Sequence, residues 1–243
     1  MGLIERAIGV TAKKGDAAAR GKVSALPQGA PFALDFTLLK SKGVFTPAAR
    51  EEAQAFELRA IKRRLLRRVG FLQRAGRDRR QVQASGRCRN LVLLTSTRPG
   101  EGKSFAAVNL ALSLALEEGV PVVLIDGDPM RPRVRSYFDL PLGPGLGDIL
   151  ADPTIPLPAV CRTAKDLPLA VIGEGSQVPN ATELFGSLEA KRFFAGLSAQ
   201  CADGLVLVDA PPMLATTEAI ALARHADEVV FVVEADSTPQ PAV

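Results

Sequence analysis

The chain has 243 residues, of which 47% are hydrophobic and 23% are charged, and its formal net charge is +4. These proportions suit a globular core, and no apolar run approaches the ~18 residues that a transmembrane helix needs. The three cysteines lie far apart without metal-ligand spacing, a pattern typical of a reducing compartment.

The first 46 residues are rich in Ala, Gly, Lys and Pro and show little periodicity. This composition favours a flexible leader over residues 1–46. A helix is expected to start at Pro47, with Thr46 as its N-cap. From there, apolar residues recur at spacings of two, three and four positions and form one stripe. The stripe consists of Phe56, Leu58, Ile61, Leu65, Val69 and Leu72.

Positive charge is concentrated in the same stretch. From Arg59 to Arg89 the chain has twelve basic residues and one acid, Asp78. We therefore expect residues 47–89 to form a basic amphipathic helix followed by a solvated linker. A solvated or protein-docking face is favoured over a nucleic-acid site, because Phe71 is the only aromatic residue interleaved with the arginines.

From residue 90 onward, apolar strands alternate with helices. We expect strands at 91–95, 121–126, 167–172, 205–209 and 228–234, and helices at 103–118, 132–138, 148–151, 181–201 (with a break near Gly186) and 216–225. This pattern predicts an α/β fold, a parallel sheet with helices on both faces, over residues 90–243. Such a sheet normally continues with a further helix and strand, so we expect the C-terminal part of the domain to be missing from this sequence.

A phosphate-binding loop is predicted between the first strand and the first helix of this domain. Residues 95–104 read Thr-Ser-Thr-Arg-Pro-Gly-Glu-Gly-Lys-Ser, and they follow the apolar run 91–94. Glycines let the backbone bend so that successive N–H groups point at phosphate oxygens. Lys103 supplies a charge to the outer phosphates, and Ser104 offers a hydroxyl to Mg²⁺. The loop departs from the full Walker A pattern in having Thr97 where that pattern has Gly.

Acids follow two further apolar strands. Asp126-Gly127-Asp128 follows the run 122–125, and Asp209 follows the run 205–208. Ligands bind at the carboxyl edge of an open parallel sheet, so these acids should meet Lys103 around one magnesium-bound triphosphate. Each acid alone could equally be a turn residue after a buried strand. Together, downstream of Gly-Lys-Ser, they favour a nucleotide site.

These motifs resemble those of the bacterial tyrosine kinases, the P-loop autokinases that control exopolysaccharide synthesis. The resemblance covers residues 52–243. It rests on the Pro-Gly-Glu-Gly-Lys-Ser core, on Asp-x-Asp followed by Arg131-Pro132, on the third acidic strand, and on the segments 145–150 and 179–184. Residues 59–66 and 234–240 look closest to the exosortase-associated tyrosine autokinases.

The resemblance implies an ATP- and Mg²⁺-dependent protein-tyrosine kinase, in which ATP and a protein tyrosine give ADP and phosphotyrosine. The implied catalytic residues are Lys103, Asp126 and Asp128, with Asp126 the leading candidate to position or deprotonate the tyrosine hydroxyl. The implied Mg²⁺ ligands are Ser104, Asp126 and Asp209. The implied nucleotide contacts are Arg98, Pro99, Gly100, Glu101, Gly102, Lys103, Ser104 and Phe105.

The family also implies partners. They are a membrane-anchored polysaccharide chain-length or activator protein and a homo-oligomer, with the kinase cytoplasmic and peripheral to the membrane; no specific nucleic acid is expected. The chain departs from the family in two places. The oligomerising Glu-x-x-Arg-x-x-Arg motif has Phe56, Arg59 and Lys62 here, with Glu57 one residue from the acidic position. The usual tyrosine cluster is absent, and we interpret the only tyrosine, Tyr137, as a packing residue rather than a phosphosite.

A partitioning or positioning ATPase of the same P-loop class is the alternative. It would use ATP as a switch without kinase activity. Such proteins place a lysine at the position of Arg98 and prefer Gly where Pro99 follows, which disfavours this alternative. Release of free phosphate without phosphotyrosine would distinguish it from a kinase.

Overall fold

The computed structural model describes residues 26–46, 53–71, 89–116 and 120–238. Its strands are β1 (Ala30–Phe32), β2 (Leu91–Ser96), β3 (Val122–Asp126), β4 (Cys161–Ala164), β5 (Leu169–Ile172), β6 (Leu205–Asp209) and β7 (Glu228–Val232). Its helices are α2 (Phe36–Ser41), α3 (Ala53–Arg68), α6 (Lys103–Ala115), α7 (Val134–Tyr137), α8 (Leu146–Ala151), α9 (Leu157–Val160), α10 (Ala181–Phe185), α11 (Leu188–Gln200) and α12 (Glu218–Ala223).

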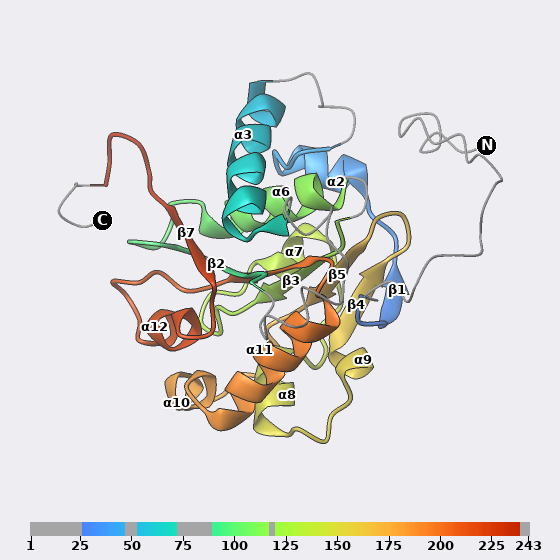
Figure 1. Ribbon diagram of the computed structural model, residues 1–243, viewed down its shortest axis with the longest axis vertical. Coiled ribbons are helices and arrows are strands. Elements are labelled where there is room, and N and C mark those ends of the chain that lie inside the picture. Colours follow the sequence, from blue (N-terminus) through green and yellow to red (C-terminus); the bar gives the residue numbers. More distant parts are fainter. Residues whose placement is uncertain (1–25, 47–52, 72–88, 117–119, 239–243) are drawn as a thin grey trace.

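The strands form one sheet in the order β1-β4-β5-β3-β6-β2-β7 (Figure 1). All neighbouring strands are parallel except β4 and β5, which are antiparallel. Every residue of β2, β3, β5 and β6 is buried. Strands this apolar need cover on both faces, so the predicted α/β class is confirmed, with one antiparallel pair added to the expected parallel sheet.

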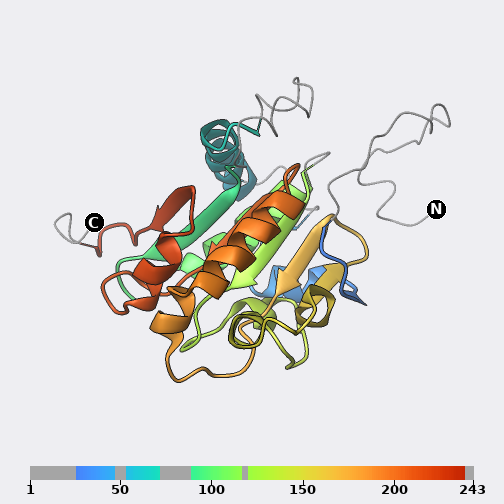
Figure 2. The same ribbon diagram turned by 60° about the horizontal axis from the view of Figure 1, so that its bottom comes forward.

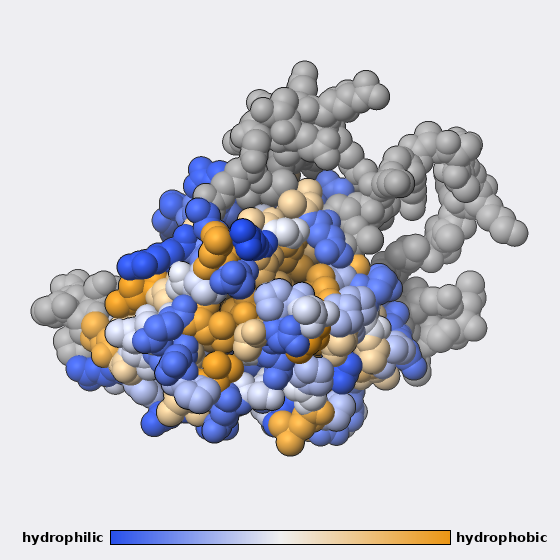
Figure 3. Space-filling view, turned by 90° about the horizontal axis from the view of Figure 1, so that it is seen from below, coloured by the Kyte–Doolittle hydropathy of each residue, from blue (hydrophilic) through white to orange (hydrophobic). Residues whose placement is uncertain are grey.

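Helices cover the sheet on both faces (Figures 1 and 2). One core cluster joins the sheet to α2, α3 and α6, with Leu39, Leu65 and Leu112 among its members. The second cluster joins the opposite face to α8, α10, α11 and α12. On the face seen from below in Figure 3, apolar side chains reach the surface between polar ones. No helix in the described ranges is both long enough and apolar enough to cross a bilayer.

The expected flexible leader is wrong for residues 26–46. β1 pairs with β4, and α2 begins after Asp35, whose carboxylate accepts from Thr37 N at 2.8 Å and Leu38 N at 3.0 Å. Leu39 and Val44 are buried in the first core cluster. Long-range packing holds this short segment, which has no sequence period of its own. Residues 1–25 lie outside the described ranges.

The break expected near Gly186 in the helix over 181–201 is confirmed. Gly186 is the C-cap of α10, and the Ser187 hydroxyl caps α11 by accepting from Ala190 N at 3.0 Å. β4 was not expected, because it is short and only half apolar. Three expected features lie outside the described residues. They are the start of the basic helix at Pro47, most of the linker, over 72–88, and the end of the helix expected over 103–118, at 117–119.

Candidate functional site

The phosphate loop joins β2 to α6. Gly100 and Gly102 have φ values of 97° and 86°, in the left-handed region that glycine adopts without strain. Gly102 is the N-cap of α6, and it offers no side chain to the first-turn N–H groups of the helix. The positive end of a thirteen-residue helix therefore begins at Lys103, which suits an anion at this point.

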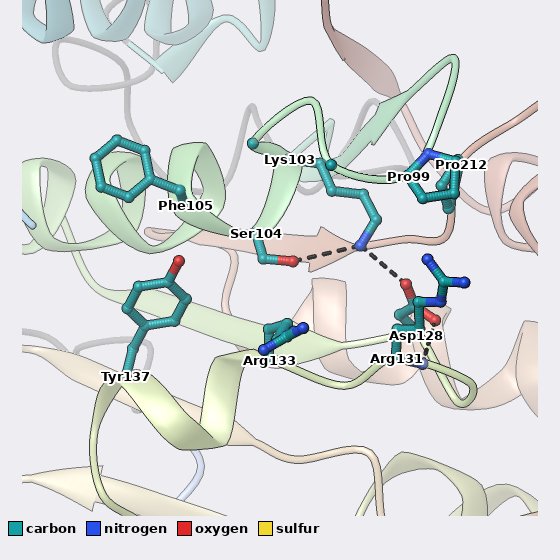
Figure 4. A pocket seen from close by; sticks show the side chains of 11 residues that line it. Pro99, Lys103, Ser104, Phe105, Asp128, Arg131, Arg133, Tyr137 and Pro212 are labelled. Carbon is teal, nitrogen blue, oxygen red and sulfur yellow. Dashed lines mark hydrogen bonds and ion pairs between the residues drawn. The ribbon is translucent and has the colours of Figure 1, made fainter. Parts of the chain in front are cut away.

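A pocket of about 390 Å³ lies against this loop (Figure 4). Its walls come from the phosphate loop, from the start of α6, from the segment between β3 and α7, from the end of α7, and from the segment after β6. The lining residues are Pro99, Gly100, Gly102, Lys103, Ser104, Phe105, Asp128, Arg131, Arg133, Tyr137 and Pro212. One cavity thus holds residues of the phosphate loop, a single acid, Asp128, and the cations Lys103, Arg131 and Arg133.

Lys103 lies at the centre of the charged groups. Its Nζ lies 2.9 Å from Asp128 Oδ2, 3.8 Å from Asp209 Oδ1 and 3.3 Å from Ser104 Oγ. Asp128 is held by the backbone as well, because its Oδ1 accepts from Arg131 N at 2.9 Å. The three strand ends therefore bring Lys103, Asp128 and Asp209 together, although they are distant in sequence.

Asp209 is buried without adequate hydrogen bonding. Its side chain is fully buried, and neither carboxylate oxygen has a hydrogen-bond partner among the described residues. Burial raises the pKa of Asp209 to about 6, and the charge of Lys103 opposes this rise. An ionised oxygen pair beside a serine hydroxyl fits a hard cation such as Mg²⁺. No cluster of three acidic, histidine or cysteine ligands lies within the described ranges, so nucleotide phosphates and water would complete the shell of such an ion.

The Asp126 carboxylate is turned into the backbone of the segment that follows it. Its Oδ1 accepts from Asp128 N at 3.2 Å, and its Oδ2 accepts from Arg133 N and Val134 N, both at 2.9 Å. Burial, together with the charge of Asp209, raises the pKa of Asp126 to about 8 against these hydrogen bonds. Asp126 and Asp209 are register partners on β3 and β6, but neither lines the pocket.

Two predicted nucleotide contacts lie outside the pocket wall. Arg98 is exposed and Glu101 is half-buried, and neither lines the cavity. Sequence reasoning did not propose Arg131, Arg133, Tyr137 and Pro212 as site residues. Arg131 and Pro212 lie within two of the motifs described above. The Arg-Pro pair that follows Asp128 could therefore have identified Arg131 as a site residue. Nothing in the spacing indicates that Arg133 and Tyr137 face the same cavity.

The chain is similar in sequence and in structure to known bacterial kinases. No protein-family model matches the chain. It is 36% identical over 147 residues to the tyrosine-protein kinase YwqD of Bacillus subtilis, covering 60% of each chain. The VpsO kinase domain is 32% identical, with a TM-score of 0.58 over 63% of this chain and 74% of that one. The BceF tyrosine kinase domain is 25% identical, with a TM-score of 0.63 over 98% of this chain and 87% of that one. The chain therefore spans less than two thirds of the length of YwqD.

Proposed function

The chain belongs to the bacterial tyrosine kinase family, and on this premise we propose that it transfers the γ-phosphate of ATP to tyrosine in a protein substrate. One observation carries the proposal. Lys103 at the start of α6 lines a pocket beside the phosphate loop together with Asp128, which follows β3, and its Nζ also lies 3.8 Å from the buried Asp209 at the end of β6. Phosphoryl transfer depends mainly on positioning and on neutralising charge, and this arrangement supplies both.

Lys103 has the largest proposed part in the reaction. Its ammonium group pairs with Asp128 at 2.9 Å. On ATP binding we expect it to bridge the β- and γ-phosphates, with the N–H groups of the loop and of the first turn of α6 around the same anion. Ser104 and Asp209 are the proposed holders of Mg²⁺, which would neutralise phosphate charge when bound.

The acceptor phenol attacks the γ-phosphorus. The new bond joins the phenol oxygen to that phosphorus, and the bond to the β–γ bridging oxygen breaks, so that ADP leaves. The phenol proton must pass to a base, and we propose Asp126 for this part because it ends β3 opposite Asp209, and burial raises its pKa to about 8. Catalytic contacts often tighten only when substrate is bound, so the present backbone bonds of Asp126 are compatible with this assignment.

The proposed cellular setting follows from the family resemblance. We propose that the chain acts in the control of exopolysaccharide synthesis, with a membrane-anchored chain-length or activator protein as its partner and the inner face of the membrane as its location. Residues 59–66 and 234–240 support the exosortase-associated branch. Self-association through α3 would need Arg59 rather than Lys62, because Lys62 is buried and its Nζ donates to Ser113 O and Oγ, both at 3.3 Å.

The test follows γ-phosphate from labelled ATP with Mg²⁺ and a tyrosine-bearing peptide. We expect phosphotyrosine on the peptide with the wild-type chain and a loss of several orders of magnitude with Lys103→Met, because a phosphate charge is left unpaired. Lys191→Met, which removes an exposed lysine of α11, is the matched control. Release of free phosphate with no phosphotyrosine would instead identify the switch ATPase.

A further inference from the structure

The phosphate loop contains a carboxylate, which is unexpected in a site for a triphosphate. Glu101 lies between Gly100 and Gly102, three residues from Ser104. Its side chain does not line the pocket. Instead, its Oε1 accepts from the Thr97 hydroxyl at 2.5 Å, and its Oε2 accepts from Arg98 N at 2.8 Å. Both oxygens are thus used inside the loop, so the carboxylate serves to shape the backbone.

A third donor reaches Glu101 from the segment that follows β7. The Thr238 hydroxyl donates to Glu101 Oε1. The same hydroxyl accepts from Glu234 N at 3.3 Å, which closes the turn over 234–238. Burial would raise the pKa of Glu101, but the hydrogen bonds from Thr238, Thr97 and the backbone lower it to about 2. The carboxylate therefore stays ionised and keeps all three bonds charge-assisted at neutral pH.

The hydrogen bond from Thr97 explains why an acid is present in the phosphate loop. It occupies the position of the first glycine of the Walker A pattern, yet Asp139 and Asp236 are the only non-glycine residues with positive φ in the described ranges. The backbone at Thr97 therefore does not need glycine. Its side chain is fully buried, and its hydroxyl is the donor to Glu101. A hydroxyl and a carboxylate thus fix a turn for which the general motif uses glycine.

We propose that Glu101 is a positioning residue that fixes the phosphate loop in its nucleotide-binding shape and couples it, through Thr238, to the segment after β7. This inference rests on the proposed nucleotide site. It implies that the outer phosphates are bound by a loop whose shape depends on three hydrogen bonds to one acid, and that a change in segment 234–238 reaches the phosphates through Glu101.

Electrostatics and positioning predict opposite results for Glu101→Gln. If the carboxylate acted only as a charge near the phosphates, its neutralisation would tighten ATP binding. The positioning role predicts weaker binding, because a glutamine has one acceptor oxygen for a site that uses two. Glu101→Ala removes all three bonds, and we expect the Kd for Mg–ATP to rise roughly tenfold, with a smaller rise for Glu101→Gln.

The experiment measures Kd for a fluorescent ATP analogue with Mg²⁺, together with the thermal midpoint without nucleotide. Thr238→Val keeps the side-chain shape but removes the donor to Glu101 and the acceptor for Glu234 N. It removes only one of the three hydrogen bonds to Glu101, so its effect on the Kd should be smaller and should not add to that of Glu101→Ala. Asp166→Asn alters an exposed acid between β4 and β5, outside the phosphate loop and the segment 234–238, and should leave the Kd unchanged. Equal or tighter binding by both Glu101 variants would overturn the proposal, as would additive effects of Thr238→Val and Glu101→Ala. Failure of the wild-type chain itself to bind ATP would instead overturn the proposed function.

Discussion

Replacement of Asp209 by asparagine should change stability and ligand binding in opposite directions. The side chain of Asp209 is fully buried, and both of its oxygens lack a hydrogen-bond partner in the described part of the chain. Asparagine keeps the shape and removes the charge. We therefore expect Asp209→Asn to be more stable than the wild type without nucleotide at pH 8, and to lose the stabilisation that Mg–ATP confers.

The magnitude follows from the pKa of Asp209. Burial raises that pKa from 3.8 to about 6, so the folded state holds a proton that the unfolded state releases. The contribution to stability is complete below pH 3.8 and is lost as pH rises through 6. Two pKa units correspond to ~3 kcal/mol in the free energy of unfolding. The buried amide of the new asparagine remains partly unpaired, which lowers this gain in the free energy of unfolding by ~1 kcal/mol or more. The net gain at pH 8 is ~2 kcal/mol, or a rise of ~4–8 °C in the melting temperature for a chain of this size.

Thermal unfolding at pH 4 and pH 8, with and without Mg–ATP, measures both effects. The gain of Asp209→Asn should be present at pH 8 and absent at pH 4, where the wild-type carboxylate is largely protonated when folded. Asp166→Asn, an exposed acid in the turn between β4 and β5, should change neither quantity. A lower melting temperature at pH 8 would refute the reasoning about burial. An undiminished shift with Mg–ATP would refute the metal role of Asp209.

The nucleotide-free wild type should lose stability between pH 5 and pH 8, because burial raises the pKa of Asp126 to about 8 and that of Asp209 to about 6; urea unfolding across this range tests it, and stability that rises with pH would contradict it. Asn90→Ala should lower the free energy of unfolding by ~3 kcal/mol, because the buried amide of Asn90 donates to the carbonyls of residues 198, 201 and 204 at 2.8–3.2 Å. Denaturant titration measures this loss, with Asn180→Ala at an exposed position as the control. The Kd for Mg–ATP of the folded Asn90 variant should not change. Phosphotyrosine should form on an added peptide and not on Tyr137, which is half-buried against the core with Lys42 Nζ 5.8 Å from its ring centroid; mass spectrometry of the chain after reaction tests it, and phosphate on Tyr137 would disprove the packing role.

The sequence predicted the convergence of the charged groups because that convergence depends on backbone topology alone. Apolar strands buried on both faces must be neighbours in a covered sheet, and their carboxyl ends then share one edge. Asp126 and Asp209 are accordingly register partners, and Lys103 starts the helix after β2. Side-chain direction does not follow from this rule. Asp126 turns toward Arg133 N and Val134 N, a choice set by the local path of the chain after the strand.

Residues 26–46 form structure that sequence periodicity could not predict, and part of the candidate site was missed for the same reason. Val44 and Phe45 are buried, but the segment has no repeat long enough to indicate a strand or a helix. The segment is held by distant residues, because Phe45 N donates to Asn109 Oδ1 of α6 at 2.7 Å. Glu101 and Thr238, which are 137 positions apart, are joined in the same way. Periodicity reports only neighbours along the chain, so contacts of this kind are invisible to it, although the second of them holds the phosphate loop.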